Sequence, residues 1–271
     1  MIDLFNYERR KSSVTHVGAL DMGGDNPVRI QSMTTTDTND TEASVAQAKR
    51  IIAAGGELVR LTTQGKREAE NLKHINAQLR SEGITTPLCA DVHFNANVAD
   101  VAALYAEKVR INPGNYVDPG RTFKILEYTD EEYAKELKKI EERLTPFINI
   151  CKENHTAVRI GVNHGSLSDR IMSRYGDTPE GIVESCMEFL RIFKKHDFND
   201  VVISIKASNT VVMVRSVRLL VHEMEREGMN YPLHLGVTEA GEGEDGRIKS
   251  AVGIGALLGD GIGDTIRVSL S

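Results

Sequence analysis

Seven segments of this chain alternate apolar residues with polar or charged residues at every second position. This period is typical of β-strands whose two faces meet different surroundings. Helical patterns separate the segments, so strands and helices follow one another in turn, which favours a parallel sheet with right-handed crossovers. The segments lie at 58–62, 89–93, 109–112, 158–163, 203–206, 233–238 and 266–269.

An earlier apolar segment at 28–33 adds one more strand. Eight strands are then predicted to begin near Val28, Leu58, Pro87, Lys108, Ala157, Val201, Leu233 and Thr265. Eight strands joined by helices indicate an α/β fold of the (β/α)8 TIM-barrel type. The alternative is a doubly wound open sheet, but its strands are buried on both faces and would not carry repeated Arg and Lys. We expect helices at 39–54, 66–81, 95–106, 129–153, 179–195, 211–227 and 248–258.

The two ends of the chain carry further signals. Residues 14–20 and 28–33 flank a turn cluster at 23–26 and predict an N-terminal β-hairpin. Asn39, with Glu42 three residues later, is the predicted N-cap of the first helix. The chain ends at the predicted eighth strand with no helix after it, so we interpret residues 1–271 as a single barrel domain truncated from a longer protein.

Composition excludes several function classes. The formal net charge of −6 and pI near 5.8 argue against nucleic acid as a main partner. There is no run of about 18 apolar residues that would span a membrane, and the first ten residues lack the apolar segment of a secretory signal. The three cysteines are far apart, which fits a reducing cytoplasm and no self-contained metal motif.

One face of the predicted strands is strongly cationic. Five cations against one carboxylate, Asp91, suggest a pocket for a small, multiply charged anion, because Arg binds phosphate through a planar fork of donors. The alternative is that some of the cations form inert ion pairs with Asp91 or Glu239. The residues assigned to this face are Arg60, Asp91, His93, Arg110, Asn112, Arg159, Asn163, Lys206, Thr238, Arg267 and Ser269.

Four of the polar residues allow more than one interpretation. Asp91 and His93 share a strand face and could contact substrate, form a buried polar pair or bind a metal, although two ligands are few for a metal. Lys206 could form a Schiff base with a carbonyl substrate, as in an aldolase, or bind phosphate. Glu239 lies in the acidic loop 239–245, which is either a solvated turn or, through Glu239, a donor or acceptor of a proton to the substrate.

Taken together, these residues resemble the barrel domain of the 4-hydroxy-3-methylbut-2-enyl diphosphate synthases, iron–sulfur enzymes of the non-mevalonate isoprenoid pathway. The matching strings span nearly the whole chain in order. They are VRIQSMT at 28–34, ADVHFN at 90–95, KVRINPGN at 108–115, VRIGVNHGSL at 158–167, LGVTEAG at 235–241 and GIGDTIRVSL at 261–270.

The resemblance implies a substrate and a set of residue roles. The family reductively opens 2-C-methyl-D-erythritol 2,4-cyclodiphosphate to (E)-4-hydroxy-3-methylbut-2-enyl diphosphate. By resemblance, Asp91, His93, Thr238 and Glu239 lie beside this substrate, and Glu239 is a candidate proton source. The implied diphosphate ligands are Arg60, Arg110, Arg159, Asn163, Lys206, Arg267 and Ser269.

The resemblance also implies parts that lie outside this chain. The family holds a [4Fe-4S] cluster on three cysteines and a glutamate in a separate C-terminal domain, takes electrons from reduced flavodoxin or ferredoxin, and works as a homodimer. We expect Cys89, Cys151 and Cys186 to be structural, and this fragment to bind substrate without a cluster and without turnover. The alternatives are a Schiff-base lyase using Lys206, a pterin-binding transferase barrel, and a non-catalytic binding module.

Overall fold

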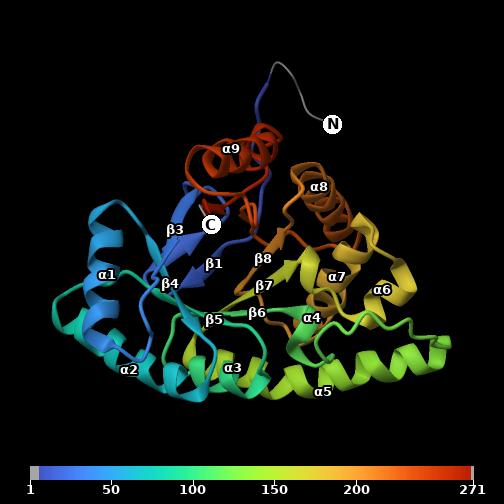
Figure 1. Cartoon of the computed structure of the whole chain (residues 1–271), viewed down its shortest axis with the longest axis horizontal. Helices are drawn as coiled ribbons and strands as arrows, with labels where there is room; N and C mark the ends of the chain where they lie inside the picture. The colour runs from blue at the N-terminus through green and yellow to red at the C-terminus, as the bar shows by residue number, and fades with distance from the viewer. Residues whose placement is uncertain (1–5, 270–271) are drawn as a thin grey trace.

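The strands pair in the order expected of a barrel. In the computed structural model, which describes residues 6–269, the eight parallel strands form a nearly closed ring with helices around it (Figure 1). The last strand pairs with both the first and the seventh, and a parallel bridge between Ile203 and Leu233 joins the remaining edges. The strands are β3 (Arg29–Met33), β4 (Leu58–Thr63), β5 (Leu88–Val92), β6 (Lys108–Ile111), β7 (Ala157–Asn163), β8 (Val201–Lys206), β9 (His234–Leu235) and β10 (Thr265–Ile266). The predicted TIM barrel is confirmed.

The long helices lie where the periodicity places them. They are α1 (Thr41–Ala53), α2 (Lys66–Ser81), α3 (Ala96–Ala102), α5 (Asp130–Asn154), α7 (Pro179–Lys195), α8 (Thr210–Arg226) and α9 (Gly243–Gly259). The short helices α4 (Pro113–Tyr116), α6 (Asp169–Tyr175) and the 3-10 turn η1 (His164–Ser166) were not predicted.

Two helix starts differ from the prediction by more than one residue. The N-cap of α1 is Asp40, whose carboxylate accepts from the Ala43 backbone N–H, so the prediction of Asn39 is wrong. Helix α9 starts five residues earlier than predicted because Glu244 and Asp245 belong to its first turn, where carboxylates interact favourably with the helix dipole.

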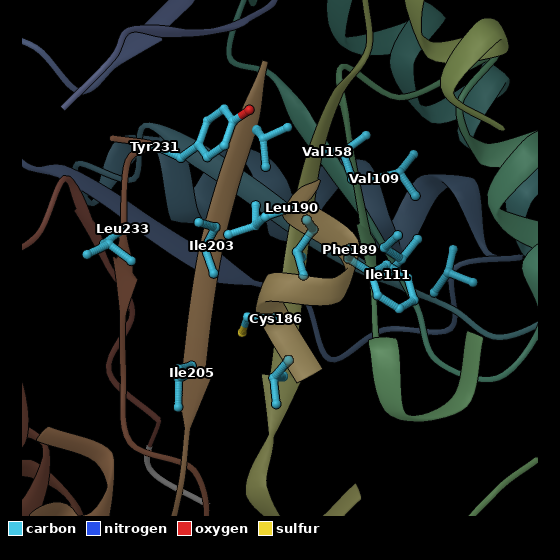
Figure 2. Close-up of a cluster of buried hydrophobic side chains, with 14 of the residues drawn as sticks. Val109, Ile111, Val158, Cys186, Phe189, Leu190, Ile203, Ile205, Tyr231 and Leu233 are labelled. Atoms are coloured by element: carbon cyan, nitrogen blue, oxygen red, sulfur yellow. The ribbon is translucent and has the colours of Figure 1, made fainter. Parts of the chain in front are cut away.

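The apolar face of the strands packs against the surrounding helices. Figure 2 shows Cys186, Phe189 and Leu190 of α7 against Ile203 and Val158 of the sheet. Because side chains alternate along a strand, residues one position away from these point into the barrel. The helix layer therefore determines which side chains line the interior.

The predicted hairpin exists, but its second strand was assigned wrongly. It consists of β1 (Thr15–Val17) and β2 (Leu20–Met22), which pair antiparallel through a turn at Gly18, where φ is +56°. Residues 28–33 instead contain β3, which pairs in parallel with β4. The chain thus turns at Gly18, before the cluster at 23–26 that suggested the turn.

The hairpin closes one end of the barrel. Val17 and Met22 form a buried cluster with residues at the amino-terminal ends of the strands, namely Leu58, Cys89, Ala157 and Val202. The Thr15 hydroxyl also donates to the Val201 carbonyl, at 2.9 Å. The hairpin therefore covers the amino-terminal end, opposite the carboxyl-terminal end where the active sites of such barrels lie.

Some expectations fall partly outside the described residues. Residues 1–5, the first half of the segment without a secretory signal, are not described, and neither is Leu270, the end of one matched string. Among the helices of residues 6–269, none combines the length and apolar character needed to cross a membrane.

Candidate functional site

The predicted cations meet inside the barrel. Arg60, Arg110, Arg159 and Lys206 are each less than 9% exposed, although all four are long charged side chains. Arg267, just past β10, is half-buried. Their strands bring them together: Asp91 lies opposite Arg110, and Arg110 lies opposite Arg159 in the sheet register. The cationic face predicted from strand alternation is therefore the lining of the barrel.

Asp91 is the carboxylate at the centre of this group. Its oxygens lie 2.5 Å from Arg60 Nη2, 3.2 Å from Arg110 Nη1 and 4.0 Å from Arg159 Nη2. Its Oδ2 is also 2.7 Å from His93 Nε2, so the two side chains form the polar pair that was one of the three alternatives. Burial acts to raise the pKa of Asp91, but Arg60, Arg110 and His93 hold that pKa well below its ordinary 3.8.

One carboxylate cannot neutralise all of these cations. Within residues 6–269, Lys206 Nζ is buried with no hydrogen-bond partner, and so are Nε and Nη1 of Arg159. Burial, followed by the neighbouring cations, lowers the pKa of Arg159 and, more strongly, that of Lys206. The interior thus carries excess positive charge and unused N–H donors, which an entering anion could satisfy.

Two glycines make room for this crowded arrangement. A Cβ on Gly161 would lie 2.5 Å from Arg110 Nε, and a Cβ on Gly236 would lie 2.9 Å from Lys206 Nζ. The Arg110 guanidinium instead reaches the Gly161 carbonyl, to which it donates at 2.9 Å. Because Gly161 on β7 and Gly236 after β9 have no side chains, Arg110 and Lys206 can lie against the barrel wall.

Sequence reasoning missed a deeper layer of polar residues. Lys108 and His234 are buried inside the barrel, two positions before Arg110 and Gly236 on their strands. Lys108 donates to Gln31 Oε1 at 3.3 Å, and neither ring nitrogen of His234 has a partner in the described part of the chain. Residues two positions apart on a strand share a face, so the alternation that indicated Arg110 would also have identified Lys108, and the same rule applies to His234 on β9.

The predicted asparagines lie at strand ends, where they organise loops. Asn112 caps α4 by accepting from the Gly114 N–H at 3.2 Å and donates to Ser166 Oγ at 2.9 Å. Asn163 ends β7 opposite Lys206 and precedes η1. The structure thus gives Asn112 a structural role that the sequence did not indicate.

The remaining predicted residues surround the opening. Thr238 and Ser269 are half-buried in the segments after β9 and β10. Glu239 is exposed and has φ of +50°, a left-handed conformation that costs a non-glycine residue about 1 kcal/mol. It lines a cleft of about 500 Å³ with residues of α8 and α9. Within residues 6–269, no ion pair or hydrogen bond joins the Glu239 carboxylate to the interior cations.

Within residues 6–269, the side chains do not form a site that fits an iron–sulfur cluster. The part of the chain that the structure describes contains no group of three or more His, Cys, Asp or Glu side chains that could hold a metal ion. Cys89, Cys151 and Cys186 are each buried and unpaired on separate elements. Burial raises the pKa of Cys151 and Cys186, which disfavours the thiolate that a metal needs.

Residues 12–271 match the sequence model of the GcpE TIM-barrel domain. The chain belongs to this family. The GcpE match agrees with the resemblance carried by the six strings, and the residues that line the barrel come from those strings, apart from Arg60, Lys206 and His234.

Curated relatives of the GcpE barrel carry one name. The chain is 79% identical over 270 residues to 4-hydroxy-3-methylbut-2-en-1-yl diphosphate synthase (flavodoxin) of Phocaeicola vulgatus, and 78% identical to that of Bacteroides fragilis. A relative of the same name in Porphyromonas gingivalis is 58% identical. The match covers 100% of this chain but 44%, 43% and 46% of those three proteins. The chain therefore spans less than half the length of these relatives.

Solved structures share the GcpE barrel's fold at low sequence identity. Dihydropteroate synthase from Xanthomonas albilineans superposes with a TM-score of 0.57 at 14% identity, over 95% of this chain and 92% of that one. A truncated 3-deoxy-D-arabino-heptulosonate 7-phosphate synthase from Thermotoga maritima gives 0.55 at 10% identity, over 96% and 81%. Likeness at this identity shows the fold alone, so it does not favour the pterin-binding alternative.

Proposed function

We propose that this chain is the substrate-binding barrel of a 4-hydroxy-3-methylbut-2-enyl diphosphate synthase and that it binds 2-C-methyl-D-erythritol 2,4-cyclodiphosphate. The observation that carries the proposal is the group of basic side chains inside the barrel: three buried arginines around Asp91, the buried Lys206 and the half-buried Arg267. Each phosphorus of the cyclic diphosphate has one ionisable hydroxyl, because the ring ester and the anhydride take the other positions. The ligand is therefore a compact dianion, which matches an interior short of negative charge.

The ligand roles follow from how each side chain is held. Arg159 and Lys206 have donors without partners, so they are the first ligands we assign to the diphosphate. Arg60 and Arg110 are anchored on Asp91 and present their remaining donors. Arg267, Asn163 and Ser269 would bind from the opening, while Asp91, His93, Asn112 and Thr238 shape the site.

The chemistry requires parts that this chain does not supply. Opening the ring takes two electrons and releases one oxygen as water, so a proton must reach the leaving oxygen. We assign the proton to Glu239, which is exposed beside the opening. Because the chain's own residues do not fit a cluster, we propose that residues 1–271 are the substrate-binding domain and that a [4Fe-4S] cluster lies in another domain of a homodimeric, cytoplasmic parent. Flavodoxin, which appears in the relatives' name, is the proposed electron donor, with ferredoxin as the alternative.

Calorimetric titration of the chain with the cyclodiphosphate tests this proposal. Arg159→Ala and Arg267→Ala should each weaken binding by about 1.5–3 kcal/mol, the usual value of a charged hydrogen bond. Arg226→Ala is the matched control, because Arg226 is an exposed residue of α8 paired with Glu223, and it should bind like the wild type. A folded wild-type chain that fails to bind the cyclodiphosphate would overturn the proposal.

A Schiff-base lyase is the second candidate, and the lowered pKa of Lys206 is the observation that favours it. An unprotonated amine can attack a carbonyl substrate, with loss of water to form the imine. Borohydride treatment in the presence of a phosphosugar would trap that imine on Lys206. An unmodified Lys206 under these conditions would exclude the lyase.

A further inference from the structure

The barrel interior holds more bases than it can keep charged. Seven basic side chains line it within residues 6–269, and a single carboxylate, that of Asp91, forms ion pairs with them. Charges this close in a low-dielectric interior repel one another, which favours loss of a proton from the amine and imidazole bases when no anion is bound. The seven are Arg60, Arg110, Arg159, Arg267, Lys108, Lys206 and His234.

Lys206 is the cation in the least favourable place. Its Nζ has no hydrogen-bond acceptor and lies against Gly236, in the space that a Cβ would otherwise fill. Four cations act on it: Arg267 from after β10, Arg159 from β7, Arg60 from β4 and Arg110 from β6. His234 faces it from β9. Asp91 is already shared among the arginines and His93, so no counter-ion remains for the ammonium.

The other bases are less able to respond to a ligand. A guanidinium keeps its proton far better than an amine, with ordinary pKa values of 12.5 against 10.5. His234 has a pKa well below its ordinary 6.5, because of burial and then Arg159, Lys206, Lys108 and Arg267, so it is neutral near pH 7. Lys108 lies a layer deeper, beside Cys89, and has the Gln31 oxygen as a partner.

We propose that the barrel binds its anion together with one proton, and that Lys206 is the group that takes the proton up. The inference rests on the proposed function, since the anion is the cyclodiphosphate assigned there. The two charges of the ligand supply the counter-ions that Lys206 lacks, so the ammonium forms and donates charge-assisted hydrogen bonds to the diphosphate. Before the anion binds, a neutral Lys206 leaves the interior with one positive charge fewer than a permanent cation at this position would.

A binding event coupled to one proton depends on pH in a defined way. Affinity falls as pH rises through the window between the pKa of Lys206 in the free barrel and its higher pKa in the complex, by up to about tenfold per pH unit. The cyclodiphosphate has no group that titrates near neutral pH, so a proton taken up on binding goes to the protein. The proton uptake measured on binding is therefore a direct measure of the change in protonation of the barrel.

The experiment measures the binding enthalpy of the cyclodiphosphate by calorimetry in HEPES and in Tris, at about pH 7 for both, because Lys108, with a pKa of about 8, already carries its proton there. These buffers differ in ionisation enthalpy, so the difference between the two measurements gives the number of protons taken up. We expect about one proton per ligand for the wild-type chain. Inorganic trimetaphosphate, a cyclic anion that also does not titrate in this range, serves as a second probe.

Two substitutions of Lys206 and one control variant test whether Lys206 is the group that takes up the proton. Lys206→Met should bind more weakly and take up no proton, and Lys206→Arg, which remains charged, should bind without uptake and with a flatter pH profile. Lys108→Met is the matched control, because it removes a buried lysine of the deeper layer and should leave an uptake of about one proton. Circular dichroism verifies that each variant is folded.

The possible outcomes separate the inference from the proposed function. Cyclodiphosphate binding without proton uptake, or uptake that persists in Lys206→Met, overturns the inference alone. Trimetaphosphate binding with uptake, in a chain that does not bind the cyclodiphosphate, supports the inference and overturns the proposed substrate. A folded chain that binds neither anion overturns both.

Discussion

At the level of single residues, Asp91 is the counter-ion that stabilises the cations of the barrel interior. It is fully buried, yet its pKa is held well below 3.8 by Arg60 and Arg110 against the opposing effect of burial. A carboxylate with a depressed pKa stabilises the fold above its unfolded-state pKa, and that contribution is lost as the pH falls through the folded-state value. The contribution of Asp91 should therefore be complete above about pH 4 and disappear in stronger acid.

Replacing Asp91 tests this role. Asp91→Asn leaves buried guanidiniums without a counter-ion, so the free energy of unfolding should fall by about 3–5 kcal/mol in urea titrations at neutral pH. Glu70→Gln, which removes an exposed partner of Lys66, should change stability by less than about 0.5 kcal/mol. Added trimetaphosphate should restore part of the lost stability, since it replaces the missing negative charge. An Asp91→Asn variant as stable as the wild type would show that the cations do not depend on this carboxylate.

Lys108 gives the opposite dependence on pH. Burial and neighbouring arginines lower its pKa from 10.5 to about 8, so between these values the unfolded chain binds more protons than the folded chain. Stability should therefore rise with pH across this window. Lys108→Met should remove that rise and increase the free energy of unfolding by about 1–3 kcal/mol at neutral pH. Urea titrations at about pH 7 and pH 10 measure both effects.

The control for Lys108 is an exposed lysine. Lys138→Met alters a side chain on the surface of α5 and should leave the pH dependence as in the wild type. Loss of stability in Lys108→Met at neutral pH would contradict the prediction. It would mean that the contact with Gln31 outweighs the cost of the buried charge.

At the level of elements, strand alternation explains both what was found and what was missed. Arg60, Arg110, Arg159 and Lys206 were assigned correctly to the interior, because the opposite face of each strand is apolar and packs on helices. His234 is the first inward-facing residue of β9, and it was missed because the list of polar residues on the strand face did not include it. The short helices α4 and α6 could not be foreseen, since a helix of one or two turns has too little periodicity to detect.

Gly161 on β7 provides a test at this scale. Gly161→Ala would place a Cβ 2.5 Å from Arg110 Nε and push the guanidinium away from Asp91. We expect the cyclodiphosphate to bind about tenfold more weakly, a change of about 1.4 kcal/mol in calorimetry. Gly255→Ala on α9, where a Cβ meets nothing within 4 Å, should instead stabilise the chain by about 0.5–1 kcal/mol. Unchanged affinity in Gly161→Ala would show that Arg110 can move without loss of binding.

On the scale of the whole molecule, the two ends of the barrel differ in the side chains that they contain. The hairpin of β1 and β2 fills the amino-terminal end with apolar side chains, while the polar and charged side chains lie towards the carboxyl-terminal end. Burial of the hairpin residues stabilises the barrel without touching the cations. Stability and ligand binding should therefore respond separately to changes at the closed end.

Met22→Ala tests this separation. Met22 is fully buried in the hairpin cluster, so its truncation should lower the free energy of unfolding by about 2–5 kcal/mol. Leu20→Ala, at a partly buried position of the same hairpin, should have a smaller effect. Calorimetry of the folded Met22→Ala chain should give wild-type affinity for the cyclodiphosphate. A large loss of affinity would indicate that the closed end positions the cations.

The sequence by itself determined the eight strands, the cationic lining and the family, because each depends on patterns local to one strand or one matched string. Only the tertiary structure showed that Asp91 is shared among three arginines, that Lys206 Nζ has no partner within residues 6–269 and that the hairpin closes one end of the barrel. These features depend on which strands are neighbours and on how far each side chain extends across the interior. Strand alternation gives the direction of a side chain, whereas its partners and its charge state follow from packing in three dimensions.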